Sequence, residues 1–454
     1  MRTRLGFPLS LNDIAKAVNG TKQRNINPVI QYISTDTREI FEGDLFIPIK
    51  GSNFDGEEFV NEAKRKGAFT VSLINKNADV KAAKSDRPLL DLASFYKEFL
   101  PYILYRVGIT GSVGKTTTKE FLRVILSGGY RVHASEGNFN NEIGMPMSVL
   151  QAPTDTEILI TEMGMNHLGE IGRMAKCICP NLSIITNIGS AHIGNLGSRE
   201  NIAKAKLEIV DAMSDGKVYV LDEEELLKNT KNRVGLSLKN PKADFYLERT
   251  INGITLYEKG IKLLEAEFAF SEEHYLECLI LACASALDIG LPINLLSKGI
   301  SAISSDNIRQ KDYFVDGYNI IDDSYNASLE SIKASIKGIE SRCTGQRKSL
   351  LLGDVLELGE FSEDYHFKIG ASIPPSLFSE IFLFGNHAEH MAKGTIAAGF
   401  PACHIHINKH LDHPEITAKQ IRSFCKSGEV ILFKASRGIR LERIIEILKE
   451  EQNE

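Results

Sequence analysis

The chain has 454 residues, which at roughly 150 residues per domain is enough for about three domains and excludes a minimal peptide or a disulfide-stapled module. Hydrophobic residues make up 43% and charged residues 25% of the sequence, a balance typical of folded proteins that excludes collagen, coiled coil and disorder. The net charge of −6, with no basic run longer than Lys64-Arg65-Lys66, excludes the charge pattern of a nucleic-acid binder.

The cysteines and the chain ends indicate the compartment. All seven cysteines follow residue 176, and the one close pair, Cys177 and Cys179, lacks zinc-type spacing, so we interpret all seven as reduced core thiols. Pro8 and Asn12 interrupt the first apolar run, and no apolar stretch approaches about 18 residues. We therefore expect a cytoplasmic protein with no integral membrane segment, acting as a monomer.

The first hundred residues mix short strand-like runs with turns, as in GDLFIPIKGSNFDG at 43–56. An amphipathic helix is predicted from Glu57 to Lys66. Residues 1–100 are therefore expected to form a small α/β domain.

A strand, a glycine-rich turn and a helix follow one another from Tyr102, through YILYRVGIT, GSVGK and TTTKEFLRVIL. In GITGSVGKTTT at 108–118 the glycines let backbone N–H groups approach phosphate, Lys115 can reach the outer phosphates, and Thr116 can offer its hydroxyl to Mg²⁺. The GxxxxGK[ST] pattern is imperfect, since it requires glycine where Ile109 stands, and a chance glycine-rich turn is the alternative. The expected nucleotide contacts are Thr110, Gly111, Ser112, Val113, Gly114, Lys115, Thr116 and Thr117.

Two further strands, at 157–161 and 182–186, alternate with helical stretches, which predicts an α/β domain over 101–305 with a mostly parallel sheet. Glu162 follows the first of these strands and His192 follows the second. Open α/β sheets bind ligands beyond the carboxyl ends of their strands, so both are candidate metal ligands. Surface or capping roles are the alternative.

Lys206 lies inside the apolar stripe of the helix expected from Arg199 to Met213, four residues after Ile202 and three before Ile209. One interpretation is a lysine whose stem packs while its ammonium reaches solvent. The other is an amine kept neutral by burial and open to modification.

Three asparagines precede a glycine and a proline in GNFNNEIGMPMSVL at 137–150, and Asn138 and Asn141 are candidate contacts for a polar substrate. Turn formation explains the same residues.

A second alternating block over 306–454 predicts strands at 319–322, 349–353, 380–385 and 429–436. Asp323 and Asn326 lie between the first of these strands and a helix that Ser328 caps, and Arg309 follows the domain boundary. The histidines of this block are expected on a solvated strand edge rather than in a metal site: His404, His406, His410 and His413.

These residues resemble the Mur ligase family over nearly the whole chain. The motifs that carry the resemblance are STDTREIFEGDLFIPIKGSNFDG at 34–56, TGSVGKTTT at 110–118, NFNNEIGMP at 138–146, TEMGMNHLGEI at 161–171, TNIGSAHIGNLGSRENIAKAKLEI at 186–209, IDDSYNAS at 321–328, LLGDVLELG at 351–359 and LFKASRG at 432–438. DDSYNAS and GDVLELG favour the branch of the family that adds D-alanyl-D-alanine over the branches that add earlier amino acids.

The resemblance implies three domains: an N-terminal domain for the UDP end of a precursor, a central P-loop-type ATPase, and a C-terminal Rossmann-like domain. It also implies the reaction. ATP would phosphorylate the terminal carboxylate of UDP-N-acetylmuramoyl-tripeptide, and the amine of D-alanyl-D-alanine would then attack the acyl phosphate and expel phosphate.

Carried over by motif, Lys115, Lys206, His192 and Arg309 are the implied catalytic residues, with Arg309 and Lys115 neutralising phosphate charge. The implied magnesium ligands are Thr116, Glu162, His192 and Lys206, the last as a carbamate. Asp323 and Asn326 are implied nucleotide contacts, and the implied UDP site is Ser34, Thr35, Asp36, Thr37 and Arg38.

Three positions depart from the family pattern. Tyr275 and Cys278 stand where the family usually has asparagines near the adenine, Ala435 replaces a usual glycine, and Leu329 stands where proline is frequent. A folylpolyglutamate-type or other Mur-family amide ligase and a nucleotide-binding regulatory protein without ligase activity are the alternative functions.

Overall fold

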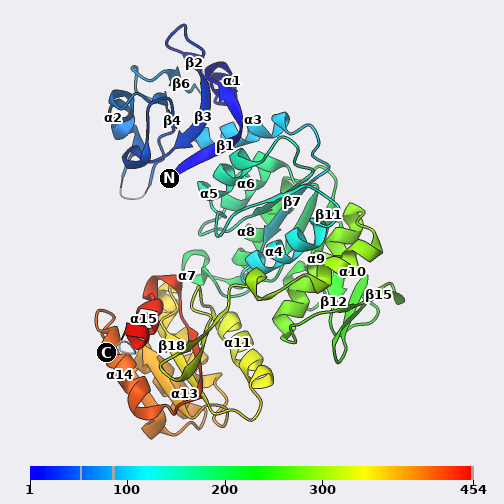
Figure 1. The fold of residues 1–454 in the computed structure, drawn as a ribbon, viewed down its shortest axis with the longest axis vertical. Helices are drawn as coiled ribbons and strands as arrows, with labels where there is room; N and C mark the ends of the chain where they lie inside the picture. Colours follow the sequence, from blue (N-terminus) through cyan, green and yellow to red (C-terminus); the bar gives the residue numbers. More distant parts are fainter. Residues whose placement is uncertain (52–53, 84–86, 451–454) are drawn as a thin grey trace.

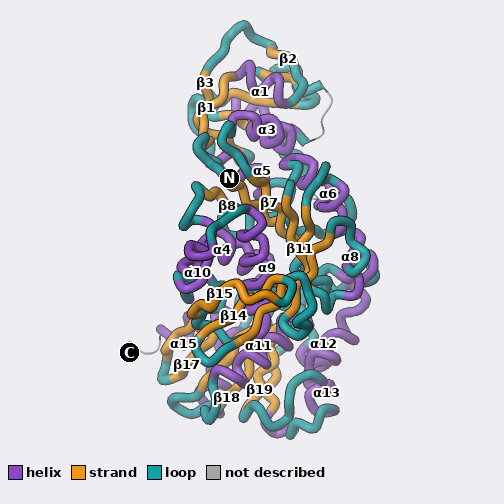
Figure 2. Tube along the Cα trace, turned by 90° about the vertical axis from the view of Figure 1, so that its right-hand side faces the viewer, coloured by secondary structure: helices purple, strands orange, loops and turns teal. Residues whose placement is uncertain are grey.

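A computed structural model describes residues 1–51, 54–83 and 87–450, so Ser52 and Asn53 of the motif at 34–56 lie outside the described residues. Three sheets follow one another along the chain, and Figures 1 and 2 show the parts that contain them arranged along the longest axis, with the N-terminal part at one end. Helices cover the sheets, which confirms the α/β class. No helix in the described part of the chain is long and apolar enough to cross a bilayer.

The N-terminal part has a six-stranded sheet in the order β1-β3-β4-β5-β6-β2, in which β1 runs antiparallel to β3. The helix expected at 57–66 forms as a short 3-10 turn over Gly56–Phe59 and then α2, because Asp55 caps the turn through the backbone of Glu57. The elements are β1 (Arg2–Ser10), α1 (Leu11–Ala17), β2 (Thr21–Lys22), β3 (Val29–Ser34), β4 (Leu45–Phe46), α2 (Val60–Arg65), β5 (Phe69–Ser72), β6 (Val80–Lys81) and α3 (Pro88–Tyr96).

The central part has a nine-stranded sheet in the order β15-β14-β13-β12-β11-β10-β7-β9-β8. The strands from β13 to β8 pair in parallel, and only the β13-β14-β15 end is antiparallel, which confirms the mostly parallel sheet. The elements are β7 (Tyr105–Thr110), α4 (Lys115–Leu126), β8 (Val132–Ala134), α5 (Gly144–Gln151), β9 (Ile158–Glu162), α6 (Glu170–Ile178), β10 (Leu182–Ile185), α7 (Ile193–Leu196), α8 (Arg199–Asp211), β11 (Lys217–Leu221), β12 (Arg233–Ser237), β13 (Phe245–Arg249), β14 (Gly253–Glu258), β15 (Ile261–Glu267), α9 (Glu273–Ile289) and α10 (Ile293–Ser301).

The C-terminal part has a six-stranded sheet in the order β16-β17-β21-β18-β19-β20, in which only β16 is antiparallel. Ser328 caps α11 through the backbone N–H of Ser331, as predicted. The elements are β16 (Lys311–Val315), β17 (Tyr318–Asp322), α11 (Leu329–Arg342), β18 (Lys348–Gly353), α12 (Ser362–Ala371), β19 (Glu380–Phe384), α13 (Ala388–Ala397), β20 (Ile405–Asn408), α14 (Pro414–Phe424), β21 (Val430–Lys434) and α15 (Glu442–Glu450).

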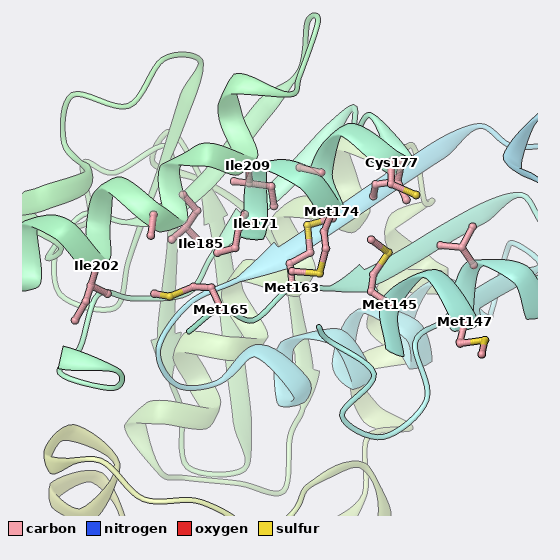
Figure 3. Packing of buried hydrophobic residues seen from close by; sticks show 14 of the residues in the cluster. Met145, Met147, Met163, Met165, Ile171, Met174, Cys177, Ile185, Ile202 and Ile209 are labelled. Carbon is pink, nitrogen blue, oxygen red and sulfur yellow. The ribbon is translucent and has the colours of Figure 1, made fainter. Parts of the chain in front are cut away.

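One buried cluster runs through the helices on one side of the central sheet and holds α8 in place. Figure 3 shows Ile202 and Ile209 of α8 with Ile185 of β10 and with Met163 and Met174 in the same region. The unbranched methionines fill irregular gaps between helices and strands. This packing fixes the apolar stripe of α8 on which Lys206 lies.

Two sequence interpretations were wrong in detail. Cys179 and Cys403 are exposed although all seven cysteines, which are free, were expected in the core. His406 was expected on a solvated edge, but it is buried between Phe382 and Phe424, at ring-centroid distances of 5.0 and 3.9 Å. The neighbouring strand β19 supplies its acidic partner: His406 Nε2 lies 2.9 Å from an oxygen of Glu380. Cross-strand pairing of this kind cannot be seen from the spacing of histidines along one strand.

Candidate active site

The glycine-rich loop leaves β7 at Thr110 and enters α4 at Lys115, as predicted. Gly111 makes the turn possible, because a Cβ at this position would lie 1.8 Å from Thr186 Oγ1. The loop is further fixed by Asn187, whose Oδ1 accepts the Val113 N–H at 3.0 Å. The free N–H groups at the start of the 12-residue helix α4 are suited to phosphate oxygens.

Lys115 is folded back onto its own loop. Its Nζ donates to the carbonyl of Gly111 at 2.8 Å. Burial lowers the pKa of the amine, the nearby Glu162 carboxylate opposes that effect, and Arg309 adds to it. An anion placed at the loop would favour the charged form of Lys115.

Glu162 ends β9 beside the loop and is 1% exposed. Its two oxygens are separately bonded: Oε2 accepts the Thr116 hydroxyl at 2.6 Å, and Oε1 accepts the Asn140 amide at 2.8 Å. Asn140, which sequence reasoning passed over between Asn138 and Asn141, is therefore the asparagine of this segment that contacts the site carboxylate. Asn141 instead accepts the backbone N–H groups of Ile143 and Gly144, the role of a turn residue.

Lys119 is a second site residue that sequence reasoning missed. It lies one turn beyond Lys115 on α4 and is fully buried. Its Nζ donates to the carbonyls of Ser135 and Gly137, the latter at 3.2 Å, and lies 3.4 Å from Glu120. The Ser135 hydroxyl in turn lies 3.4 Å from the Glu162 N–H. Lys119 thus ties the segment that carries the asparagines to the phosphate-loop helix. The sequence feature that could have indicated Lys119 is its spacing of four residues from Lys115, which places both lysines on one face of the helix.

Lys206 is 1% exposed on α8 and has no hydrogen bond or ion pair to any described residue. Burial, and then the positive charge of Lys115, hold the pKa of its amine well below the usual value. The side chain therefore does not reach solvent, which favours the neutral-amine interpretation over the solvent-reaching one.

His192 and Gly194 lie where the central part meets the C-terminal part, with α7 at the junction in Figure 1. His192 Nδ1 lies 2.5 Å from a carboxylate oxygen of Glu357, and this contact lowers the pKa of Glu357. The Gly194 N–H donates to the Glu357 carbonyl at 3.1 Å. A Cβ on Gly194 would lie 2.5 Å from Leu358 C and from Gly359 N, so the two backbones meet with no room for a side chain.

The C-terminal part supplies further polar groups to the loop. Arg309 donates from Nη2 to the Thr116 hydroxyl, and its guanidinium lies 3.8 Å from the centre of the Tyr325 ring. Asp323 accepts from Lys434 Nζ at 2.7 Å and from the Ser335 hydroxyl at 2.5 Å. Asn326 accepts the Ala327 N–H at 3.0 Å.

A cavity of about 480 Å³ lies between the central and C-terminal parts, and most of the predicted site residues line it. They are Ser112, Val113, Gly114, Lys115, Thr116, Thr117, Asn138, Asn141, Glu162, His192, Arg309, Asp323 and Asn326. Thr110, Gly111 and Lys206 do not line it. Thr110 and Lys206 are buried, and a Cβ on Gly111 would face Thr186.

The predicted UDP-site residues lie in the N-terminal part and outside this cavity. Ser34 is fully buried, with its hydroxyl donating to the Asp36 carbonyl at 2.9 Å, and the Thr35 N–H donates to the Met1 carbonyl. Arg38 hydrogen-bonds Asp36 and holds the pKa of that carboxyl well below its usual range. The Thr37 carbonyl accepts from Lys66 at 2.8 Å. The structure gives these residues local roles in a turn.

The described residues include no group of three or more His, Cys, Asp and Glu side chains arranged to hold a metal ion. The donor set at the loop is nevertheless of the hard, oxygen-rich kind that suits Mg²⁺, because the Thr116 hydroxyl and the Glu162 carboxylate are already in contact. The buried Lys206 amine has no oxygen atom of its own, so it would join such a set only after a modification that adds one. The residues present therefore fit a magnesium ion, and Lys206 would belong to the ligand set only if its amine is modified.

Comparisons with known proteins cover nearly the whole chain. The family description "Mur ligase middle domain" matches residues 109–284, and "Mur ligase, glutamate ligase domain" matches residues 308–437. The chain is 35% identical to the UDP-N-acetylmuramoyl-tripeptide--D-alanyl-D-alanine ligase of Bacillus subtilis, over 97% of this chain and 98% of that protein. It is 25% identical to the ligase of the same name from Escherichia coli, over 97% and 98%.

Solved structures agree with these sequence comparisons. MurF from Acinetobacter baumannii superposes with a TM-score of 0.87 at 25% identity, covering 98% of this chain and 99% of that one. MurF ligase from Thermotoga maritima, solved in complex with ADP, gives a TM-score of 0.79 at 27% identity, covering 93% and 97%.

Replacing Lys119 by Met should lower the free energy of unfolding by about 2 kcal/mol, because the carbonyls of Ser135 and Gly137 would lose their donor while buried. Urea unfolding followed by circular dichroism measures the change. Arg123→Met on the same helix is the control; it breaks a half-exposed ion pair with Glu120 and should cost less than about 0.5 kcal/mol. Equal losses for the two variants would contradict the anchoring role.

Replacing Gly194 by Ala should reduce turnover at least about tenfold, since the added methyl group cannot fit against Leu358 and Gly359. Circular dichroism should stay close to that of the wild type, because the added methyl group disturbs a contact between two parts. The thermal midpoint should fall, since Ile193 and Leu358 on the two sides of the contact belong to one buried cluster. Gly128→Ala is the matched control, as a Cβ there meets only the Ile125 carbonyl at 3.6 Å. Unchanged steady-state rates in Gly194→Ala would show that turnover does not need this junction.

Proposed function

The chain belongs to the Mur ligase family, and from that premise we propose how its residues carry out the reaction. It is an ATP-dependent ligase that joins D-alanyl-D-alanine to UDP-N-acetylmuramoyl-tripeptide in the synthesis of peptidoglycan precursors. The observation that carries this function is the full-length match to relatives of that activity, and a cleft built around a phosphate loop and a buried carboxylate agrees with it.

The chemistry explains why the cleft needs cations. A carboxylate is a poor electrophile, and both it and ATP are anions. One carboxylate oxygen of the tripeptide attacks the γ-phosphorus, and the bond to the β-phosphate oxygen breaks to release ADP. The D-alanyl-D-alanine amine then adds to the acyl carbon, phosphate leaves with the bonding electrons, and loss of a proton from nitrogen leaves the amide.

We assign the charge neutralisation to Lys115 and Arg309, which approach Thr116 and the phosphate loop from the central and C-terminal parts. In this assignment the Lys115 ammonium leaves the Gly111 carbonyl for phosphate oxygens when ATP binds. Asp323 and Asn326 are assigned to the nucleotide because they line the same cleft from the C-terminal part. The Glu357–His192 and Gly194 contacts close the cleft and exclude the water that would hydrolyse the acyl phosphate.

Magnesium is part of the proposal. A bound Mg²⁺ would neutralise phosphate oxygens and polarise the phosphorus, and Thr116, Glu162, His192 and a carbamylated Lys206 are the residues that would hold it. Carbamylation joins the uncharged Lys206 amine to CO₂ with loss of one proton, which replaces a cation by an anionic oxygen ligand. The buried, unpartnered state of Lys206 supports this assignment.

Two further groups of residues are assigned to the substrate ends. We propose that Ser34 to Arg38 contribute to the site of the UDP end, and that Asn138 and Asn141 lie along the path of the tripeptide. We also propose that the protein works as a monomer, and in the cytoplasm, where its nucleotide substrates are found. The presence of Lys115, Glu162, His192 and Lys206 together argues against a nucleotide-binding regulatory protein without ligase activity.

The direct test incubates the protein with ATP, Mg²⁺, UDP-N-acetylmuramoyl-tripeptide and D-alanyl-D-alanine. We expect ADP, phosphate and the pentapeptide product in equal amounts, with little ADP when either acceptor is omitted. Replacing the tripeptide by a folate and the dipeptide by glutamate tests the folylpolyglutamate alternative. ADP release that neither acceptor stimulates would rule out the ligase.

Replacing Lys206 by Ala should reduce turnover by at least about 1,000-fold, since the site would lose a proposed metal ligand. Lys204→Ala is the control, because Lys204 is exposed on the same helix two residues earlier and should keep the wild-type rate. A second readout is independent of turnover: ¹³C-bicarbonate should give a carbamate signal in the NMR spectrum of the wild type and of Lys204→Ala but not of Lys206→Ala. The same signal in all three proteins would exclude Lys206 as its source.

A further inference from the structure

Helix α11 of the C-terminal part contacts the central part through one carboxylate. Glu330, in the first turn of α11, accepts the Ser190 N–H on Oε1 and the Ser190 hydroxyl on Oε2, both at 3.0 Å. Ser190 is 1% exposed, and Glu330 is partly buried. Both donors of one residue are thus held by both oxygens of another that lies 140 positions further along the chain. The proposed reaction assigns no role to this contact.

The residues beside Ser190 continue this contact to the phosphate loop. The Gly189 N–H donates to Ser112 Oγ at 2.8 Å, and the Ser112 N–H donates to the Asn187 carbonyl at 3.1 Å. A Cβ on Gly189 would lie 3.0 Å from the Glu330 carboxyl carbon and 3.1 Å from Ser112 Cβ. Gly189 therefore lies between the carboxylate and the loop, with little room for a side chain.

Glu330 itself lies outside the cavity between the two parts. Ser112 and Ser190 line that cavity, whereas Glu330 is not among the described residues that do so. Hydrogen bonds to a carboxylate are stronger than those between neutral groups, so the pair of bonds can hold Ser190 firmly. Glu330 would therefore act on a bound ligand by positioning the residues that line the cavity.

The start of α11 also carries the side chain on which Arg309 lies. Tyr325 comes five residues before Glu330, and the Arg309 guanidinium lies 3.8 Å from the centre of the Tyr325 ring. Arg309 in turn donates to the Thr116 hydroxyl. One segment of the C-terminal part therefore reaches the phosphate loop at both of its ends, through Ser112 and through Thr116.

We propose that Glu330 is a positioning residue for the phosphate loop. Its carboxylate holds Ser190, and the neighbouring Gly189 then fixes the Ser112 side of the loop. The loop and Arg309 thereby reach their reactive arrangement together. The consequence for turnover rests on the proposed function, whereas the effect on the loop does not. The alternative is a contact that only stabilises the junction of the two parts and leaves the loop unchanged.

Hydrogen exchange followed by mass spectrometry tests the loop in the full chain without nucleotide or metal. Glu330→Ala should speed exchange at least about fivefold in the peptides over 108–118 and 186–192, because the bonds that hold both segments are lost. Glu330→Gln should stay within about twofold of the wild type, since its amide oxygen can accept the Ser190 N–H and its NH₂ group can donate to the hydroxyl. The control Glu340→Ala removes an exposed carboxylate of the same helix and should change neither peptide.

Three results of this experiment would overturn the proposal. Faster exchange confined to 186–192 would show that the contact does not reach the loop. Faster exchange that also includes β19 and β20, far along the C-terminal sheet, would show a general loss of stability instead of positioning. Unchanged exchange in Glu330→Ala would show that the contact holds neither segment.

Steady-state rates in the acceptor-dependent ligase assay measure the consequence for turnover. Glu330→Ala should lower kcat about tenfold, and Glu330→Gln should keep it within about threefold of the wild type. A wild-type kcat in Glu330→Ala would overturn the role in turnover. The ligase itself is judged by whether the wild type forms product. If it forms none, the proposed reaction fails, while the exchange experiment still decides whether Glu330 positions the loop.

Discussion

The site depends on burying one carboxylate beside a phosphate loop. Glu162 is 1% exposed at the end of β9, and an isolated buried carboxylate would be costly. The fold satisfies it from two directions, with the Thr116 hydroxyl from α4 and the Asn140 amide from the segment after β8. Because β7 and β9 are parallel neighbours, the loop and this carboxylate leave the same edge of the sheet. The rest of the cleft is arranged around that pair.

A site built by one sheet would remain open to water, which an acyl phosphate cannot tolerate. The C-terminal part brings Arg309 to Thr116 of the loop, and it contacts the central part through backbone as well as side chains. At Gly194 the main chain of the central part lies so close to the main chain at Leu358 and Gly359 that a methyl group on Gly194 would not fit. The same arrangement of the two parts that makes this close contact also places Arg309 at the loop, which supports the proposed exclusion of water from the cleft.

The strands and the phosphate loop could be predicted from the sequence because each depends on residues that are close together along the chain. Buried parallel strands such as β18 read as continuous apolar runs, and the strand–glycine turn–helix order located Lys115 and Thr116. Predictions failed where a partner comes from a distant segment. Asn140 was passed over because only the fold shows which of three adjacent asparagines faces Glu162, and the acidic partner of His406 lies on another strand. The Glu357–His192 contact joins residues 165 positions apart and leaves no local pattern.

Three buried lysines in the central part have different surroundings, and these surroundings suit different roles. Lys119 donates to two carbonyls and lies beside the Glu120 carboxylate, so its role is structural. Lys115 has one close carbonyl and a lowered pKa, which suits the proposed exchange of that carbonyl for phosphate. Lys206 has no partner, and a second cation lies close enough to lower its pKa further. A negative oxygen in place of the Lys206 amine would attract Lys115 instead of repelling it. The burial of Lys206 and its lack of a partner among the described residues therefore support the proposal that this lysine is the one that is modified.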